Sequence, residues 1–266
     1  MLDQFNRKIS YLRISVTDRC DLRCIYCMPS EGITWLDHSK MLSFEEIIDV
    51  VEVAVELGIE KIRLTGGEPL VRKGIANLVK MIAETKGVKD LAMTTNGQQL
   101  EKYAEELYKA GLNRVNVSLD TLNSEKYSML TRGGDIGKVF AGLEAAYHTG
   151  LSPIKINCVL NEQTTEEDKL ELSSFCKEKD YKLRFIHQMS LTTGSFYPVE
   201  GGDGGQCSIC NRIRLTAQGD VKPCLFSSYG YNVREWEAKN AIHRAIGRKP
   251  EKGQKNLVNE FYNIGG

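Results

Sequence analysis

Short β-rich apolar runs alternate with helical segments up to about position 186, and this alternation constrains the fold more than any other feature. Strands are expected near 10–15, 61–64, 90–94, 114–118, 153–160 and 182–186. Helices are expected near 43–57, 75–86, 98–110, 137–149 and 165–178. Strands that alternate with helices form βαβ units and a parallel α/β sheet. Six units favour an incomplete (β/α)6 barrel, a partial TIM barrel with its chemistry at the C-terminal strand ends, although a doubly wound sheet also fits.

The alternating pattern stops after Met189. Residues 190–206 are rich in Gly, Ser and Thr and predict a linker or mobile loop. Two short strands, around 211–217 and 220–224, and a helix near 232–246 are expected beyond it. We therefore divide the chain into a barrel region (1–189), a Gly-rich linker (190–206) and a C-terminal region (207–266).

The composition bounds the class of protein. The chain has 266 residues with formal net charge zero, which argues against a general nucleic-acid surface but allows a local basic pocket. No apolar run approaches the roughly 20 residues that span a bilayer, and the polar start lacks the apolar stretch of a signal peptide. The eight cysteines then predict thiolate ligands in a reducing compartment, and the cytoplasm is the expected location.

Three cysteines lie close together after the first predicted strand. Cys20, Cys24 and Cys27 have x3 and x2 spacing. Three thiolates on one loop can bind three irons of a [4Fe–4S] cube and leave the fourth iron open to a cofactor or substrate. Structural zinc normally has four ligands at paired spacings, so a zinc knuckle completed by a distant Cys or His is the less favoured alternative.

A second cysteine triplet lies in the C-terminal region. Cys207, Cys210 and Cys224 form a C-x2-C-x13-C pattern, again with three thiolates and one open position. Zinc with His187 or a water as fourth ligand is the serious alternative to a second cluster. Cys158 and Cys176 lie on predicted apolar faces and are expected in the core.

The surroundings of the first triplet resemble the radical S-adenosylmethionine (SAM) superfamily. Gly66-Gly67-Glu68-Pro69 follows the second predicted strand, where that superfamily binds the SAM amino group. Taken singly, such residues are more often turn, cap or core residues, and their common position at strand ends carries the resemblance. The SAM contacts that it implies are Tyr26, Gly67, Glu68, Thr94, Asn96, Ser118 and Met189.

The sequence around both triplets is similar to the GTP 3′,8-cyclase (MoaA) family of molybdenum cofactor biosynthesis. The likeness covers almost the whole chain. It rests on Tyr-Leu-Arg-Ile-Ser-Val-Thr-Asp-Arg-Cys at 11–20, Cys-Asn-Arg-Ile-Arg-Leu-Thr-Ala at 210–217, Lys-Pro-Cys-Leu-Phe at 222–226 and a terminal Gly-Gly pair. The resemblance implies two [4Fe–4S] clusters, of which the first cleaves SAM to a 5′-deoxyadenosyl radical and the second contacts the guanine of GTP. The radical would abstract hydrogen from C3′ of GTP, and this carbon would attack C8.

Basic residues within predicted strands indicate where the substrate triphosphate binds. A basic residue inside a barrel strand is unfavourable without an anion partner, although solvated charges at exposed strand ends are an alternative. The resemblance implies these GTP ligands: Arg13, Lys61, Arg63, Lys155, Arg184, Arg212 and Arg214. It also implies catalytic roles for Arg212, Arg214, Gly265 and Gly266, the last two in a tail that reaches the active site.

The family resemblance extends to partners and also exposes one departure. It implies a flavodoxin- or ferredoxin-type electron donor, a downstream cyclic pyranopterin monophosphate synthase and a homodimer. The family usually has several dozen more residues between the sixth strand and the second cluster, so a wall or lid of the cavity is expected to be missing. A related radical SAM enzyme acting on another nucleotide or on a peptide is one rival hypothesis, and a non-catalytic zinc-binding interaction protein is the other.

Overall fold

The computed structural model describes residues 1–257 and Ile264. Within these residues the strands form one nine-stranded sheet in the order β6-β5-β4-β3-β2-β1-β7-β8-β9. Strands β1 to β7 pair in parallel, and β8 and β9 are added antiparallel. The strands are β1 (Tyr11–Ser15), β2 (Lys61–Thr65), β3 (Asp90–Thr95), β4 (Arg114–Ser118), β5 (Lys155–Leu160), β6 (Lys182–His187), β7 (Arg212–Leu215), β8 (Asp220–Lys222) and β9 (Tyr231–Asn232).

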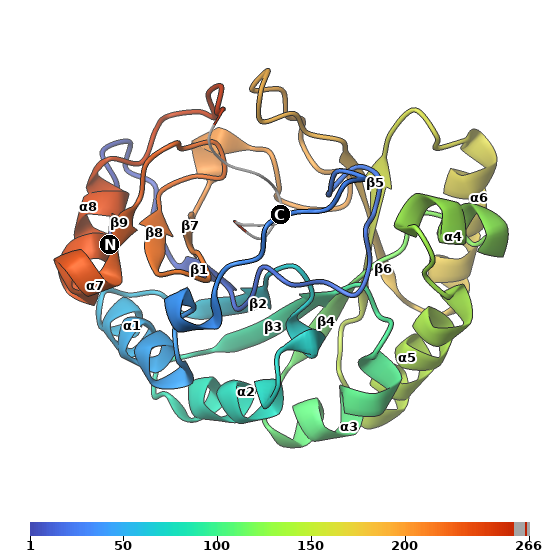
Figure 1. The fold of residues 1–266 in the computed structure, drawn as a ribbon, viewed down its shortest axis with the longest axis horizontal. Coiled ribbons are helices and arrows are strands. Elements are labelled where there is room, and N and C mark those ends of the chain that lie inside the picture. The colour runs from blue at the N-terminus through green and yellow to red at the C-terminus, as the bar shows by residue number, and fades with distance from the viewer. Residues whose placement is uncertain (258–263, 265–266) are drawn as a thin grey trace.

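The helices lie along the outside of the curved sheet, and β6 and β9 are its two edge strands (Figure 1). The open, mostly parallel sheet confirms the predicted α/β partial barrel. The helices are α1 (Phe44–Glu56), α2 (Ile75–Glu84), α3 (Leu100–Lys109), α4 (Ser124–Thr131), α5 (Ile136–Thr149), α6 (Glu166–Glu178), α7 (Val233–Trp236) and α8 (Ala238–Gly247). Short 3-10 turns are η1 (His38–Lys40), η2 (Pro69–Val71) and η3 (Cys207–Ile209).

The structure confirms the six strands and five helices expected before residue 186, with boundaries that differ by a few residues. It adds α4, whose largely polar sequence lacks an apolar stripe and buries only Tyr127, Leu130 and Thr131. It also divides the expected helix near 232–246 into α7 and α8 at Glu237, which has a φ of +57° and so cannot continue a right-handed helix.

Strand alternation separates the core from the interior of the barrel. Leu12 and Ile14 on β1 are fully buried in one apolar cluster with residues of the outer helices. Arg13 lies between them and therefore points to the opposite face, toward the inside of the barrel. The same pattern places Arg63 between the buried Ile62 and Leu64 on β2. Cys158 and Cys176 are buried in the core, as predicted.

The C-terminal region continues the barrel sheet. Strand β7 pairs in parallel with β1, and the register places Arg214 beside Arg13. Residues 190–206 return along β6, with Glu200 bridged to Phe185. Among residues 1–257 and 264, none of the helices combines the length and apolar character needed to cross a membrane.

Candidate functional site

A cavity of about 300 Å³ inside the barrel collects the basic residues that the sequence singled out. They come from five strands, β1, β2, β5, β6 and β7, which lie far apart in the sequence. All seven predicted GTP ligands line this cavity: Arg13, Lys61, Arg63, Lys155, Arg184, Arg212 and Arg214. The parallel register explains the convergence, because it aligns Arg63, Arg13 and Arg214 side by side on three neighbouring strands.

Burial and mutual repulsion lower the pKa values of Arg13, Arg63, Lys155, Arg184 and Arg214. Burial is the main cause at Arg13, whose pKa is well below its usual range, and the charges of Arg214 and Arg63 add to the effect. Burial and the charge of Arg212 lower the pKa of Arg214 to about 10. Burial, followed by the charge of Arg184, lowers the pKa of Lys155 to about 8. Because these buried charges repel one another, the cavity is electrostatically unfavourable when it is empty. A bound polyanion would compensate the charges.

Two of the guanidinium groups also have a buried N–H donor without an acceptor. Within the described part of the chain, the Nε atoms of Arg63 and Arg184 are buried and have no hydrogen-bond partner. The guanidinium of Arg63 lies 5.4 Å from the ring centre of Tyr11, which cannot neutralise its charge. Buried donors without acceptors are unfavourable, so the residues fit a ligand with several negatively charged oxygens.

The lining also includes residues that were not predicted, among them Tyr11, Arg114, Asn157 and Lys249. Arg114 differs from the other cations because its Nη2 lies 2.5 Å from Oδ2 of Asp90. Its position at the start of β4 was a signal of the same kind as Lys61 on β2. Lys249 gave no such signal, because it follows α8 and reaches the cavity only through the tertiary fold.

The second cysteine triplet lines the same cavity. Cys207 begins η3, Cys210 immediately follows it, and Cys224 follows β8. Burial raises the pKa of Cys210, but the charges of Lys249 and Arg212 outweigh it and hold the pKa at about 7. No three His, Cys, Asp or Glu side chains of the described residues converge on a point that could hold one metal ion. A cube makes no such demand, since each thiolate binds a different iron.

Near the C-terminus, Ile264 is one of the described residues. Its side chain is buried with Leu191, Leu225 and Phe226, and its carbonyl oxygen accepts a 3.4 Å hydrogen bond from Nη1 of Arg214. Arg214, Leu225 and Phe226 line the cavity. Gly265 and Gly266, for which catalytic roles were predicted, lie outside the described residues.

The first cysteine triplet lies on a loop that the rest of the protein holds in place. The N–H of Ile25 donates to Leu130 O and that of Arg23 to Thr131 O, so the loop bonds the end of α4. The guanidinium of Arg132 donates to Arg23 O and Met28 O, both at 2.9 Å. Burial raises the pKa of Cys20 to about 12 and that of Cys27 to about 11, and it also raises the pKa of Cys24. Three partly buried free thiols on one loop suit iron, which displaces their protons on binding.

The Gly66–Pro69 turn packs directly against the residues before Cys20. A Cβ on Gly67 would overlap the carbonyl oxygen of Arg19. The carboxylate of Glu68 is fully buried and accepts from Leu70 N, Thr95 Oγ1 and Asn96 N. Burial raises the pKa of Glu68 to about 7 despite these bonds. Glu68 therefore joins the loops after β2 and β3.

The other predicted SAM contacts are divided between two places. Asn96 lies beside the cysteine loop, and its Nδ2 donates to Asp21 Oδ1 at 2.7 Å and to Cys20 Sγ at 3.8 Å. The Tyr26 hydroxyl donates to Asp120 Oδ2 at 2.7 Å. Thr94 and Ser118 are half-buried near the ends of β3 and β4. Met189 lines the cation cavity.

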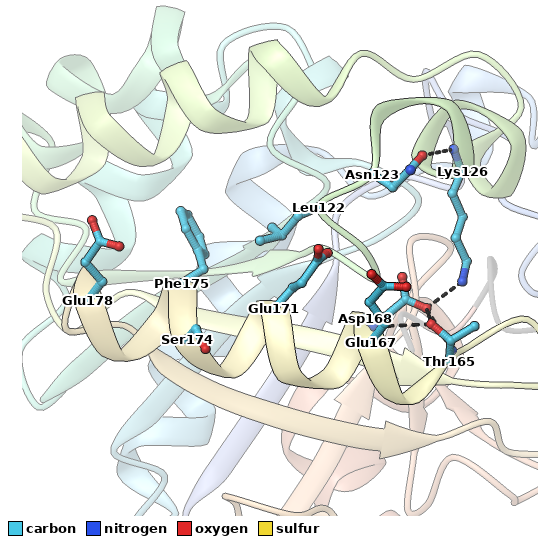
Figure 2. Close-up of a pocket in the computed structure, with 10 residues that line it drawn as sticks. All are labelled: Leu122, Asn123, Lys126, Thr165, Glu167, Asp168, Glu171, Ser174, Phe175 and Glu178. Carbon is cyan, nitrogen blue, oxygen red and sulfur yellow. Dashed lines mark hydrogen bonds and ion pairs between the residues drawn. The ribbon is translucent and has the colours of Figure 1, made fainter.

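A second cavity, of about 630 Å³, lies outside the barrel between α4 and α6. Figure 2 shows Lys126 extending from α4 toward Asp168 and Thr165 at the start of α6, while Glu171 and Glu178 lie further along that helix. The Lys126–Asp168 ion pair, at 2.5 Å, already neutralises one of its carboxylates. None of the predicted site residues lines it.

Comparisons with known proteins identify the family of the barrel region and relatives of the whole chain. Residues 14–176 match the model of the radical SAM superfamily. A curated GTP 3′,8-cyclase of Petrotoga mobilis is 41% identical, covering 90% of this chain and 88% of the relative. Another, of Clostridium botulinum, is 38% identical over 319 aligned positions that cover 100% of both chains. This chain has only 266 residues, so the alignment leaves many residues of that relative without a counterpart.

Solved structures share the fold at low sequence identity. Streptococcus suis SuiB bound to the precursor peptide SuiA is similar with a TM-score of 0.71 and 18% identity, over 91% of this chain and 65% of SuiB. The structure of anSMEcpe with bound AdoMet has a TM-score of 0.64 and 18% identity, over 89% of this chain and 79% of that one. At this level of identity the likeness concerns the fold alone.

Proposed function

Because the chain belongs to the radical SAM superfamily and, within it, to the GTP 3′,8-cyclase family, we propose that it converts GTP to (8S)-3′,8-cyclo-7,8-dihydro-GTP for molybdenum cofactor biosynthesis. Hydrogen leaves C3′ of the ribose, the same carbon bonds to C8 of guanine, and an electron and a proton complete an isomer of GTP. A [4Fe–4S] cluster bound by Cys20, Cys24 and Cys27, together with SAM, supplies the 5′-deoxyadenosyl radical that takes this hydrogen.

The observation that carries the proposal is the cation cavity. Nine Arg and Lys side chains line a space of about 300 Å³ that is also lined by the second cysteine triplet. A triphosphate needs several cations because its charge cannot be buried uncompensated. The cation side would bind the phosphates, and Cys207, Cys210 and Cys224 would hold a second [4Fe–4S] cluster whose open position faces the base.

Individual residues would divide the work of holding the two ligands. Arg63, Arg13 and Arg214 form a continuous row across three strands, which suits consecutive phosphate groups. Asn96 and the Gly66–Pro69 turn lie beside the first cysteine loop, which suits SAM. The buried Glu68 would align these loops, and Met189, Thr94, Ser118 and Tyr26 would complete the SAM pocket. Gly265 and Gly266, following Ile264, would complete the active site near Arg214.

The segment between β6 and the second cysteine triplet is shorter than in the family, but it still forms part of the cavity wall. Residues 196–206 contribute Phe196, Tyr197 and Gly202 to its lining. We propose that this short segment replaces the longer wall of the relatives and that the retained cations preserve the preference for GTP.

Anaerobic incubation with SAM, GTP and a strong reductant tests the activity. We expect two products, 5′-deoxyadenosine and a nucleotide with the mass of GTP. In the proton NMR spectrum of this nucleotide, the aromatic signal of the C8 proton should be absent. The Cys20→Ala variant should form neither product, and ATP should not replace GTP. Formation of 5′-deoxyadenosine that GTP does not stimulate, with no isomer, would count against GTP as substrate.

The structural likeness to SuiB, which was solved with a precursor peptide, favours one second candidate: a radical SAM enzyme that modifies a peptide. A cavity lined by nine cationic side chains is unfavourable for a neutral peptide, so this candidate ranks lower. Thermal-shift measurements with GTP and with peptides distinguish the two. Iron counting after anaerobic reconstitution excludes the zinc-binding alternative if about eight irons are found per chain.

The remaining partners follow from the proposed reaction. The radical step needs single electrons, which a flavodoxin or ferredoxin would supply in the cytoplasm, and the product needs a cyclic pyranopterin monophosphate synthase downstream. A homodimer belongs to the same proposal. Cross-linking and size measurements in solution test the dimer.

A further inference from the structure

Lys249 is an unusual feature of the cation cavity. It is 1% exposed, and it is the largest side chain among the most completely buried residues. A lysine is almost never fully buried unless its ammonium group has a specific role or partner. It comes after α8, outside both cysteine motifs, yet it lines the same cavity as all three cysteines of the second triplet.

The ammonium group of Lys249 connects the segments that carry the cysteines. Its Nζ donates to Arg212 O and to Pro223 O, both at 2.7 Å. Arg212 follows Cys210 by two residues, and Pro223 immediately precedes Cys224. A single side chain therefore bridges the backbone segments that carry two of the three thiols.

Within residues 1–257 and 264, no carboxylate lies within ion-pair distance of Lys249, and its ammonium group donates to two neutral carbonyl oxygens. The charge lies close to the thiols, because the two carbonyls that it binds belong to residues two positions after Cys210 and one position before Cys224. Three thiolates on a dicationic cube leave about one negative charge, and a nearby cation favours the more negative, reduced state.

A neighbouring cation provides a comparison. Arg7 is also buried, and it donates to Cys207 O at 2.8 Å as well as to Pro250 O and Glu251 O. Unlike Lys249, it is paired with a carboxylate, because its Nε lies 2.6 Å from Asp3 Oδ2. Arg7 therefore holds a cysteine loop without adding net charge.

We propose that Lys249 is a positioning residue of the second cluster: it holds the Cys210 and Cys224 segments in place and raises the reduction potential of that cluster through its uncompensated charge. The inference rests on the proposed second cluster. It predicts that the effect of the charge on the reduction potential can be separated from the positioning of the segments. Arginine at this position keeps the charge, whereas methionine and glutamine remove it.

The test uses the full chain with Cys20→Ala, Cys24→Ala and Cys27→Ala, so that only the second cluster is loaded. Iron is counted after anaerobic reconstitution, and the midpoint potential is measured by a redox titration followed by electron paramagnetic resonance. We expect about four irons per chain in this background. Lys249→Arg should keep the potential. Lys249→Met and Lys249→Gln should lower the ratio of reduced to oxidised cluster at a fixed potential at least tenfold, which is about 59 mV for one electron.

The paired substitution Asp3→Asn with Arg7→Gln is the matched control, since it removes a loop contact without changing net charge. This double variant should have lower thermal stability and an unchanged midpoint potential of the second cluster. If it moves the potential as far as Lys249→Met does, or if the loaded Met and Gln variants keep the parental potential, the role of Lys249 is overturned. Absence of iron in the parent background would instead overturn the second cluster itself.

Discussion

At the scale of single residues, the cation cavity stores unfavourable electrostatic energy that a ligand can release. Arg63 and Lys155 have like charges around them, and Asp90, an acid that acts on both, is already paired with Arg114. Such residues weaken the empty protein and strengthen binding of an anion. Two predictions follow from opposite sides of this balance.

Lys155 should make GTP binding dependent on pH. Its pKa is about 8 in the empty cavity, because burial and the charges of Arg184, Arg114 and Arg63 outweigh Asp90, and a bound triphosphate should raise it. Binding then requires proton uptake above pH 8, so the affinity should fall about fivefold between pH 8 and pH 9. The triphosphate loses its last proton near pH 6 and does not interfere. Calorimetry of GTP binding measures this slope, and Lys155→Arg should flatten it; an equal slope in the variant would contradict the assignment.

Arg63→Met should stabilise the protein and impair its binding site. Removal of a buried guanidinium among like charges is expected to raise the free energy of unfolding of the ligand-free protein by about 1 kcal/mol or more. Loss of a phosphate contact should weaken GTP binding at least tenfold. Chemical denaturation and calorimetry measure the two effects. Lys182→Met serves as control, because Lys182 is exposed on β6 and pairs only with Asp180, so neither quantity should change appreciably.

At the scale of elements, the turn between β2 and η2 supports the loop of the first cysteine triplet. Gly67 and Glu68 donate their N–H groups to Thr17 O and Arg19 O, and Glu68 accepts from the loop after β3. The cysteine loop is thus held from one side by this turn and from the other by α4. Sequence motifs that look like separate ligand contacts are in contact with one another here.

Gly67→Ala should therefore disturb the first cluster. The new methyl group would overlap backbone atoms of Asp18 and Arg19, which cannot move as a flexible side chain can. We expect a loss of about 2 kcal/mol or more in unfolding free energy and fewer bound irons, with loss of SAM cleavage. Gly247→Ala is the control, since a Cβ there meets nothing within 4 Å. A Gly67→Ala protein with full iron content and normal stability would disprove the packing argument.

At the scale of the whole molecule, the barrel and the C-terminal region depend on each other. Strand β7 covers the edge of β1, α8 packs on α1, and Arg7 near the N-terminus bonds Cys207. The strands on either side of the boundaries predicted at 189 and 206 belong to one continuous sheet. The second cysteine triplet is consequently supported by both ends of the chain.

A fragment of residues 1–206 should not fold as a stable unit. It would expose the edge of β1 and the face of α1 that α8 covers, and unpaired strand edges favour aggregation. We expect a protein that is largely insoluble or that unfolds at least 10 °C below the full chain, measured by calorimetry. The full chain expressed and purified in parallel is the control. A monomeric fragment that unfolds cooperatively at the temperature of the full chain would show that the barrel region is independent.

By itself, the sequence determined the alternating strands and helices, the two cysteine triplets and the basic strand residues, because these depend on local periodicity and on spacing along the chain. Lys61 and Arg63 could be read from β2 alone, and Cys207, Cys210 and Cys224 from their pattern. Only the tertiary structure decided that β7 pairs with β1, which places Arg214 beside Arg13, and that Lys249 reaches the second triplet from beyond α8. It also showed Glu68 buried among backbone and side-chain donors. Such features depend on contacts between residues distant in the chain, and no local pattern encodes those contacts.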